Sequence, residues 1–270
     1  MEIGDLVTRK SYNDDIIFII LNILNGVAYL ASINYRLNAD SPLSDLNLVC
    51  NKNNSSYFME KNKHSNSNTT LSNNEPDRRI IPHSIMNIFK KNFASNTLIL
   101  HIDGDKFYLK ESMKQYKFSR VNVLGFAIHE NKQPEAIKNL LNKYNPKIIV
   151  ITGHDSLIND KPNSTNINDY KNSKYFIDST KIARSFNSDY NDLVIISGGC
   201  KSNYEELMNA GANFASSPER KLINITDPVN IACLLATSSK ENQLDIDYFI
   251  NKIPLEPGCI GGIATCGQYL

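Results

Sequence analysis

The sequence has no tryptophan, no CxxC pair and almost no net charge, and each absence argues against a class of protein. Its 29 basic and 28 acidic residues leave a formal net charge of +1, without the basic stripe that predicts a nucleic-acid-binding surface. The five cysteines are odd in number, and their spacing predicts neither a disulfide framework nor a zinc site. We therefore expect no metal, no cofactor and no nucleic-acid partner.

Long hydrophobic runs are also missing. The longest, Ile16 to Leu24, is interrupted by Asn22 and falls far short of the ~20 apolar residues that a membrane-spanning helix needs. The first residues lack the basic and apolar regions of a secretory signal peptide. These absences predict a protein without a membrane span that is made and kept in a cytoplasm.

The composition is that of an ordinary globular protein, with 270 residues of which 41% are hydrophobic, and it changes along three zones. Residues 1–49 predict a small SH3-like β-barrel, because Asn25-Gly26 between two apolar runs is a strong hairpin signal. Residues 50–95 form an Asn- and Ser-rich linker with too few apolar side chains to fold. Proteolysis concentrates in such exposed tethers, so the dibasic Arg78-Arg79 is a candidate self-cleavage site.

Residues 96–270 alternate between strand-like and helix-like segments. Continuous β-branched runs predict buried strands, and a segment with helical spacing follows each one. Strands are predicted at 97–102, 121–128, 147–152, 193–197 and 213–216, and helices at 106–116, 134–144, 173–186, 203–210 and 228–235. Right-handed crossovers make a doubly wound, mainly parallel α/β sheet the simplest arrangement.

Binding and catalytic sites in such a sheet form beyond the carboxyl ends of its strands. His154 follows the third predicted strand, and Cys200 follows the fourth after Gly198-Gly199. Adjacent strands lie about 4.8 Å apart, so the two side chains are predicted to come within reach of each other. An imidazole beside a thiol lowers the thiol pKa and relays its proton, and a following helix start favours the thiolate. We therefore expect Cys200 to be a nucleophile and His154 its base.

The loops around this pair supply further candidates. The amide of Cys200, with that of Gly153 or Gly199, is a candidate oxyanion hole, because glycines let a substrate backbone approach closely. Asp155 is a candidate to orient the histidine. The residues after the first strand are candidates for lining a substrate pocket: His101, Asp103 and Asp105. Each acidic residue is also placed to cap the helix or loop that follows it.

The same loops fit a non-catalytic alternative. Asp103, Asp105 and Asp155 at strand ends are similar to the carboxylates with which a phosphoacceptor receiver domain binds Mg²⁺. Such a domain carries a lysine before its late proline, whereas this chain has Ser217 before Pro218. A receiver-like or docking module is therefore the alternative hypothesis, and it leaves the Gly-Gly-Cys turn unexplained.

Several long and colinear stretches of the chain resemble one family. They include NYRL at 34–37, ADSP at 39–42, LHIDGD at 100–105, VITGHD at 150–155, YKNSKYF at 170–176 and GANFASSP at 211–218. In these stretches the sequence resembles the sporulation-specific protease family YabG of spore-forming Firmicutes. The family's cysteine and histidine correspond to Cys200 and His154. The arrangement is also similar to the caspase and gingipain group, except that Gly153 precedes the histidine where that group has a glycine after it.

The resemblance implies a cysteine peptidase that acts during spore formation. It implies cleavage of coat, cortex-lytic or germination proteins next to basic residues, notably after Arg, and processing of the peptidase itself. The implied location is the cytoplasm of the mother cell, with incorporation in the spore coat as a further expectation. Peptide ligation or deamidation by the same two residues shares the acyl-enzyme and remains an alternative.

Overall fold

The computed structural model describes residues 1–50, 96–158, 164–241, 243–244, 255 and 258–268. The chain divides into two compact units, Met1–Arg79 and Ile80–Leu270. Apart from Cys50, the predicted linker at 50–95 lies outside the described residues. The proposed self-cleavage site at Arg78 and Arg79 lies there too, so both remain predictions.

The N-terminal unit contains a five-stranded antiparallel sheet in the order β4-β3-β2-β1-β5. The predicted hairpin is confirmed: Asn25 and Gly26, with φ of 51° and 78°, form a tight turn with positive φ at both positions. The described strand pairs form an open order, so closure into an SH3-like barrel remains a prediction. The elements are β1 (Leu6–Arg9), η1 (Lys10–Tyr12), β2 (Phe18–Leu24), β3 (Val27–Ser32), β4 (Asn38–Pro42), η2 (Leu43–Asp45) and β5 (Leu46–Cys50).

The C-terminal unit is built on a six-stranded sheet in the order β12-β10-β9-β8-β6-β7. Its strands pair in parallel except for β12, which runs antiparallel to β10 at one edge. The Gly-rich stretch that forms β12 was not predicted as a strand. The strands are β6 (Leu98–Asp103), β7 (Asn122–Ala127), β8 (Ile148–Thr152), β9 (Val194–Ser197), β10 (Phe214–Ser216) and β12 (Ile260–Gly262), with the separate pair β11 (Gln243–Leu244) and β13 (Thr265–Cys266).

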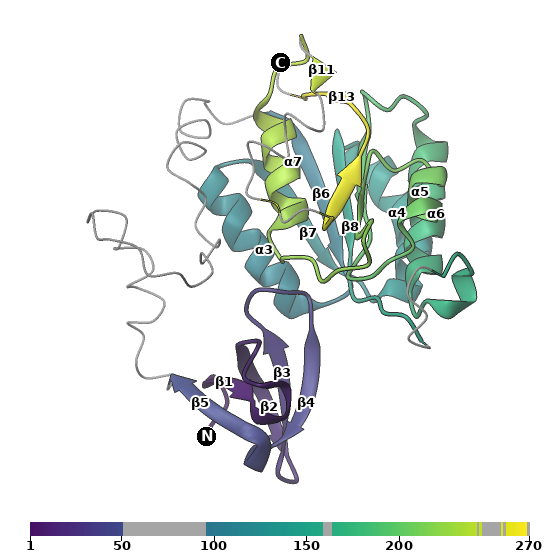
Figure 1. Cartoon of the computed structure of the whole chain (residues 1–270). Coiled ribbons are helices and arrows are strands. Elements are labelled where there is room, and N and C mark those ends of the chain that lie inside the picture. The colour runs from purple at the N-terminus through teal and green to yellow at the C-terminus, as the bar shows by residue number, and fades with distance from the viewer. Residues whose placement is uncertain (51–95, 159–163, 242, 245–254, 256–257, 269–270) are drawn as a thin grey trace, which may run out of the picture. The chain divides into compact units, whose positions relative to one another are not determined.

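Helices cover both faces of this sheet, as predicted (Figure 1). On one face, α3 and α7 contribute to a core with side chains such as Val150 and Ile196. On the other face, α4, α5 and α6 pack against side chains such as Ile149 and Ile151. The helices are α3 (Lys106–Ser119), α4 (Gln133–Tyr144), α5 (Ser173–Phe186), α6 (Tyr204–Asn209) and α7 (Asp227–Thr237), with short turns η3 (Glu130–Lys132) and η4 (Ile167–Asp169).

The strand order reverses at β6, which is the first strand of this unit. The chain moves from β6 to β7 on one side, and then crosses to β8 on the other side. Loops that leave the carboxyl ends of strands at such a reversal separate and leave space for a ligand. The sequence stretches at 103–105 and 153–155 lie at the carboxyl ends of β6 and β8, so the fold places them at this position.

Candidate active site

Asp105 and His154 follow neighbouring strands at the same level. In the parallel pair of β6 and β8, Asp103 lies opposite Thr152, and Asp105 and His154 each come two residues later. His154 Nε2 lies 2.9 Å from Asp105 Oδ2, and the two side chains are 27% and 19% exposed. A carboxylate on one imidazole nitrogen fixes the ring and directs the other nitrogen to the reaction. Asp105, which we predicted to line a substrate pocket, therefore occupies the place of an orienting residue.

The scaffold holds both members of this pair. Asp105 caps α3, because its Oδ1 accepts the backbone N–H of Phe107 at 2.7 Å. Beneath the histidine, the buried carboxylate of Glu130 accepts the backbone N–H of His154 at 2.7 Å. A Cβ on Gly153 would lie 2.5 Å from that Glu130 oxygen, so a larger residue here would displace the Glu130 side chain. Sequence reasoning missed Glu130, and the signal that points to it is this glycine.

The loops after β8 and β9 lie side by side. In the parallel pair of β8 and β9, Ile151 lies opposite Ser197, and His154 and Cys200 each come three residues later. A Cβ on Gly199 would lie 2.5 Å from the carbonyl oxygen of Gly153, and Gly198 has a φ of 113° that favours glycine. The two glycines before the cysteine therefore allow the sharp turn and the close approach that we expected of them.

The thiol of Cys200 is almost fully buried, with 2% of the residue exposed. The backbone N–H of Ile223 donates to Cys200 Sγ at 3.3 Å, and Cys259 lies in the same small apolar cluster. The predicted helix follows, but it begins at Tyr204 with Asn203 as its cap. The effect of a helix dipole falls off within the first turn, so the dipole of this helix acts on its capping residue. This corrects our expectation that the helix start stabilises the thiolate of Cys200.

Asp155, the predicted orienting residue, binds to the scaffold. Its Oδ2 accepts the hydroxyl groups of Ser173 and Ser202, the latter at 2.9 Å, and its Oδ1 accepts the N–H of Asn172 at 2.8 Å. Burial raises the pKa of Asp155 above its ordinary range, although the hydrogen bonds act in the opposite direction. Asp155 therefore connects the loop after β8 to the loop after β9, and the carboxylate on the imidazole is that of Asp105.

His101 and Asp103 belong to the core of the sheet, with both side chains 0% exposed. The His101 ring lies between the Tyr116 hydroxyl, at 3.0 Å from Nδ1, and Thr152 Oγ1, at 2.8 Å from Nε2. Asp103 Oδ2 accepts a hydrogen bond from the same threonine hydroxyl at 3.0 Å. Side chains buried this completely offer no surface to a substrate, so the structure does not support our placing them in a substrate pocket.

Cys233 differs from a reactive cysteine in its surroundings. It lies within α7, and complete burial raises the pKa of its thiol to about 12. Since the thiolate is the nucleophilic form, this residue is not a competing nucleophile near neutral pH. It packs in the core, as cysteine side chains commonly do.

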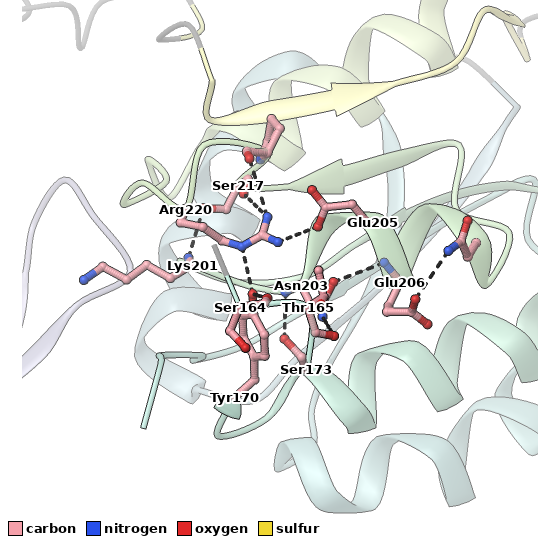
Figure 2. A network of polar contacts seen from close by, with 12 residues as sticks. Ser164, Thr165, Tyr170, Ser173, Lys201, Asn203, Glu205, Glu206, Ser217 and Arg220 are labelled. Carbon is pink, nitrogen blue, oxygen red and sulfur yellow. Dashed lines mark hydrogen bonds and ion pairs between the residues drawn. The ribbon is translucent and has the colours of Figure 1, made fainter. Parts of the chain in front are cut away.

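A polar network lies beside the loop that carries Cys200 (Figure 2). At its centre Arg220 forms an ion pair with Glu205, and its Nε donates to the Tyr170 hydroxyl at 2.9 Å. Partial burial raises the pKa of Glu205, but the hydrogen bond and charge of Arg220 outweigh this, so the pKa lies below its ordinary value. Sequence reasoning missed the network because Tyr170 and Arg220 are 50 residues apart.

Almost the whole chain matches a known peptidase family. The family model for the YabG peptidase U57 matches residues 2–270. The chain belongs to this family. It is also 36% identical over 279 aligned residues to the sporulation-specific protease YabG of Bacillus subtilis (strain 168), covering 98% of this chain and 95% of that relative. No solved structure matches the chain.

Family membership confirms the predicted resemblance and makes the chain a peptidase. The fold alone does not decide this, because the order β7-β6-β8-β9-β10 is the one that receiver domains also use. Within the part of the chain that the structure describes, no helix has the length and apolar character to cross a membrane.

Proposed function

We propose that this peptidase is a cysteine endopeptidase of sporulation, with Cys200 as nucleophile and His154 as general base. The observation that carries the proposal is the row of Asp105, His154 and Cys200 beyond β6, β8 and β9, with the first two hydrogen-bonded. A histidine after one parallel strand and a cysteine after the next is also the basis for a caspase-like arrangement.

The reaction follows from the roles of these two residues. His154 takes the proton of the Cys200 thiol as the sulfur attacks the carbonyl carbon of the scissile bond. Electrons move onto the carbonyl oxygen, for which the amide of Cys200 with that of Gly153 is the candidate oxyanion hole. The N–H of Gly199, the other candidate, already donates to Ser202 Oγ at 2.9 Å. The C–N bond then breaks as the imidazolium protonates the leaving amine, which leaves a thioester. Water, deprotonated by His154, attacks the thioester and releases the carboxylic acid and the thiol.

The substrates we propose are spore coat, cortex-lytic and germination proteins, cut next to basic residues and after Arg in particular. The similar protein of Bacillus subtilis carries the name sporulation-specific protease, which supports a role in spore formation. We place the enzyme in the cytoplasm of the mother cell, with incorporation in the spore coat. The N-terminal sheet, which we propose closes as an SH3-like barrel, is suited to docking a protein substrate.

The test is cleavage of a peptide with a single Arg by the full chain and by Cys200→Ala and His154→Ala variants. Both variants should lose cleavage down to background, because each removes an atom that forms or breaks a bond. Cys266→Ser is a matched control, since this half-exposed cysteine lies in β13. Undiminished cleavage by Cys200→Ala would reject the nucleophile.

Self-processing is proposed at Arg78 or Arg79. N-terminal sequencing of the matured protein should find a new terminus just after one of these residues. The Cys200→Ala variant should keep the segment intact. An active enzyme in which residues 50–95 remain uncut would sink this part of the proposal.

A further inference from the structure

The segment from Ser217 to Ile223, here named the cover segment, closes over the nucleophile. Its last residue donates its N–H to Cys200 Sγ at 3.3 Å. Its Lys221 carbonyl accepts the N–H of Lys201, the residue after the nucleophile, at 3.2 Å, and also the Ser217 hydroxyl at 2.7 Å. The segment therefore contacts the nucleophile loop through its backbone, as a bound peptide would. With Cys200 2% exposed, a substrate carbonyl has no approach to the sulfur in this conformation, in which Ile223 of the segment and Cys259 pack on the cysteine.

The side chain of Arg220 connects the cover segment to the polar network. The guanidinium of Arg220 points into the network with Glu205 and Tyr170 (Figure 2), and its side chain is only 7% exposed. Both Ser217 and Arg220 adopt left-handed φ, 68° and 54°, a region that residues other than glycine seldom use. Contacts of the side chains must hold such a backbone in place, and the ion pair that joins the segment to another element is that of Arg220 with Glu205.

The carboxylate of Glu205 differs from the acidic residues that we first considered for a basic substrate side chain. Asp103 and Asp155 are buried and hydrogen-bonded within the fold, and Asp105 binds the imidazole. Glu205 is 56% exposed, lies in the first turn of α6 after the nucleophile loop and already binds a guanidinium. The phenol of Tyr170 adds an acceptor for the guanidinium Nε, which gives the site a shape as well as a charge.

We propose that Glu205 and Tyr170 form the subsite for a basic side chain of the substrate, and that Arg220 fills this subsite in the resting chain. The inference rests on the proposed function and names the specificity-determining residues of that same site. A substrate arginine that replaces Arg220 releases the anchor of the cover segment. Recognition of the substrate and exposure of Cys200 are then one event, because one guanidinium leaves as the other enters.

The first test compares two peptides that differ only in having arginine or its neutral isostere citrulline before the scissile bond. In Glu205→Gln, the ratio of kcat/KM for the arginine peptide to kcat/KM for the citrulline peptide should fall about tenfold, as expected for the loss of one charge-assisted contact. The ratio is the measure because the same substitution also frees Arg220, which affects both peptides alike. Glu206→Gln is the matched control, because this exposed neighbour on α6 contacts Asn209 instead. Equal effects of Glu205→Gln on both peptides would overturn the subsite.

The second test measures how fast iodoacetamide labels Cys200 in the folded chain. Arg220→Ala should accelerate labelling about tenfold and lower KM for the arginine peptide, since the competing guanidinium is gone. Lys221→Ala removes an exposed charge from the same segment and should change neither quantity. Arg220→Lys should label at an intermediate rate, which guards against loss of folding in the alanine variant. Unchanged labelling in both Arg220 variants would reject the cover role.

Failure of this inference is distinct from failure of the proposed function. If Cys200→Ala keeps cleaving the arginine peptide, the nucleophile is wrong whatever Glu205 does. If Cys200→Ala is inactive while Glu205→Gln treats arginine and citrulline as the wild type does, the peptidase assignment stands. The basic side chain then binds elsewhere, and Arg220 is a structural clamp.

Discussion

The hydrogen bond between Asp105 and His154 can be weakened with little change of shape by Asp105→Asn. The bond joins Oδ2 to Nε2 at 2.9 Å between side chains that are 19% and 27% exposed. A hydrogen bond to a charged group contributes about 1.5–3 kcal/mol, and partial exposure favours the lower end. Since about 1.4 kcal/mol changes a rate tenfold, we expect kcat to fall roughly tenfold. KM should change little, because the bond orients the base and does not contact substrate.

The same substitution tests whether the effect is one of catalysis or of folding. Asparagine also caps helices well, so Asp105→Asn should retain the cap on Phe107 and the stability of α3. Asp105→Ala loses the cap as well and should lower the free energy of unfolding by about 1 kcal/mol in urea titrations. The reasoning is refuted if Asp105→Asn keeps wild-type kcat, or if kcat in the two variants follows stability alone.

Two further predictions concern buried carboxylates. Glu130→Ala removes the acceptor for the backbone N–H of His154, and steady-state assays should show a kcat about tenfold lower. Glu130→Gln keeps an acceptor oxygen and should recover kcat. Equal loss in both variants would contradict a role of Glu130 in holding the loop. Because burial raises the pKa of Asp155 in the folded state, the folded chain binds this proton more tightly than the unfolded chain. This stabilisation is present below the pKa of the carboxyl in the unfolded chain, about 3.9, and is lost as the pH rises through the raised pKa of the folded chain. Urea titrations across that window should show the wild type losing stability relative to Asp155→Asn with rising pH, and an opposite slope would refute this.

The alternation of strands and helices in the C-terminal unit could be predicted because it depends on local pattern. Continuous β-branched runs identify strands buried on both faces, and helical spacing identifies the covering helices. The helix predicted at 173–186 has the observed bounds, Ser173–Phe186. Placing His154 and Cys200 beyond neighbouring strands required only this pattern and the general rule about strand ends. The antiparallel edge strand β12 was not predicted, because its glycines show no strand pattern.

The partners of these residues could not be predicted, because they depend on contacts between distant parts of the chain. Asp155 is next to His154 in the sequence and Asp105 is 49 residues away, yet the carboxylate of Asp105 meets the imidazole and that of Asp155 meets Ser202. Their difference arises from strand register and from the direction in which each loop turns. Glu130 is fixed beneath His154 by packing around a glycine that lies 23 positions further along the chain.

The sequence by itself determined a parallel α/β unit, a family and a cysteine with a histidine at the ends of adjacent strands. Only the tertiary structure decided that Cys200 is buried and that Glu205, rather than a carboxylate beside the histidine, binds a guanidinium. The physical reason is the difference between local and long-range interactions along the chain. Periodicity along a chain predicts which face of an element is buried, whereas an ion pair depends on where loops from different elements meet.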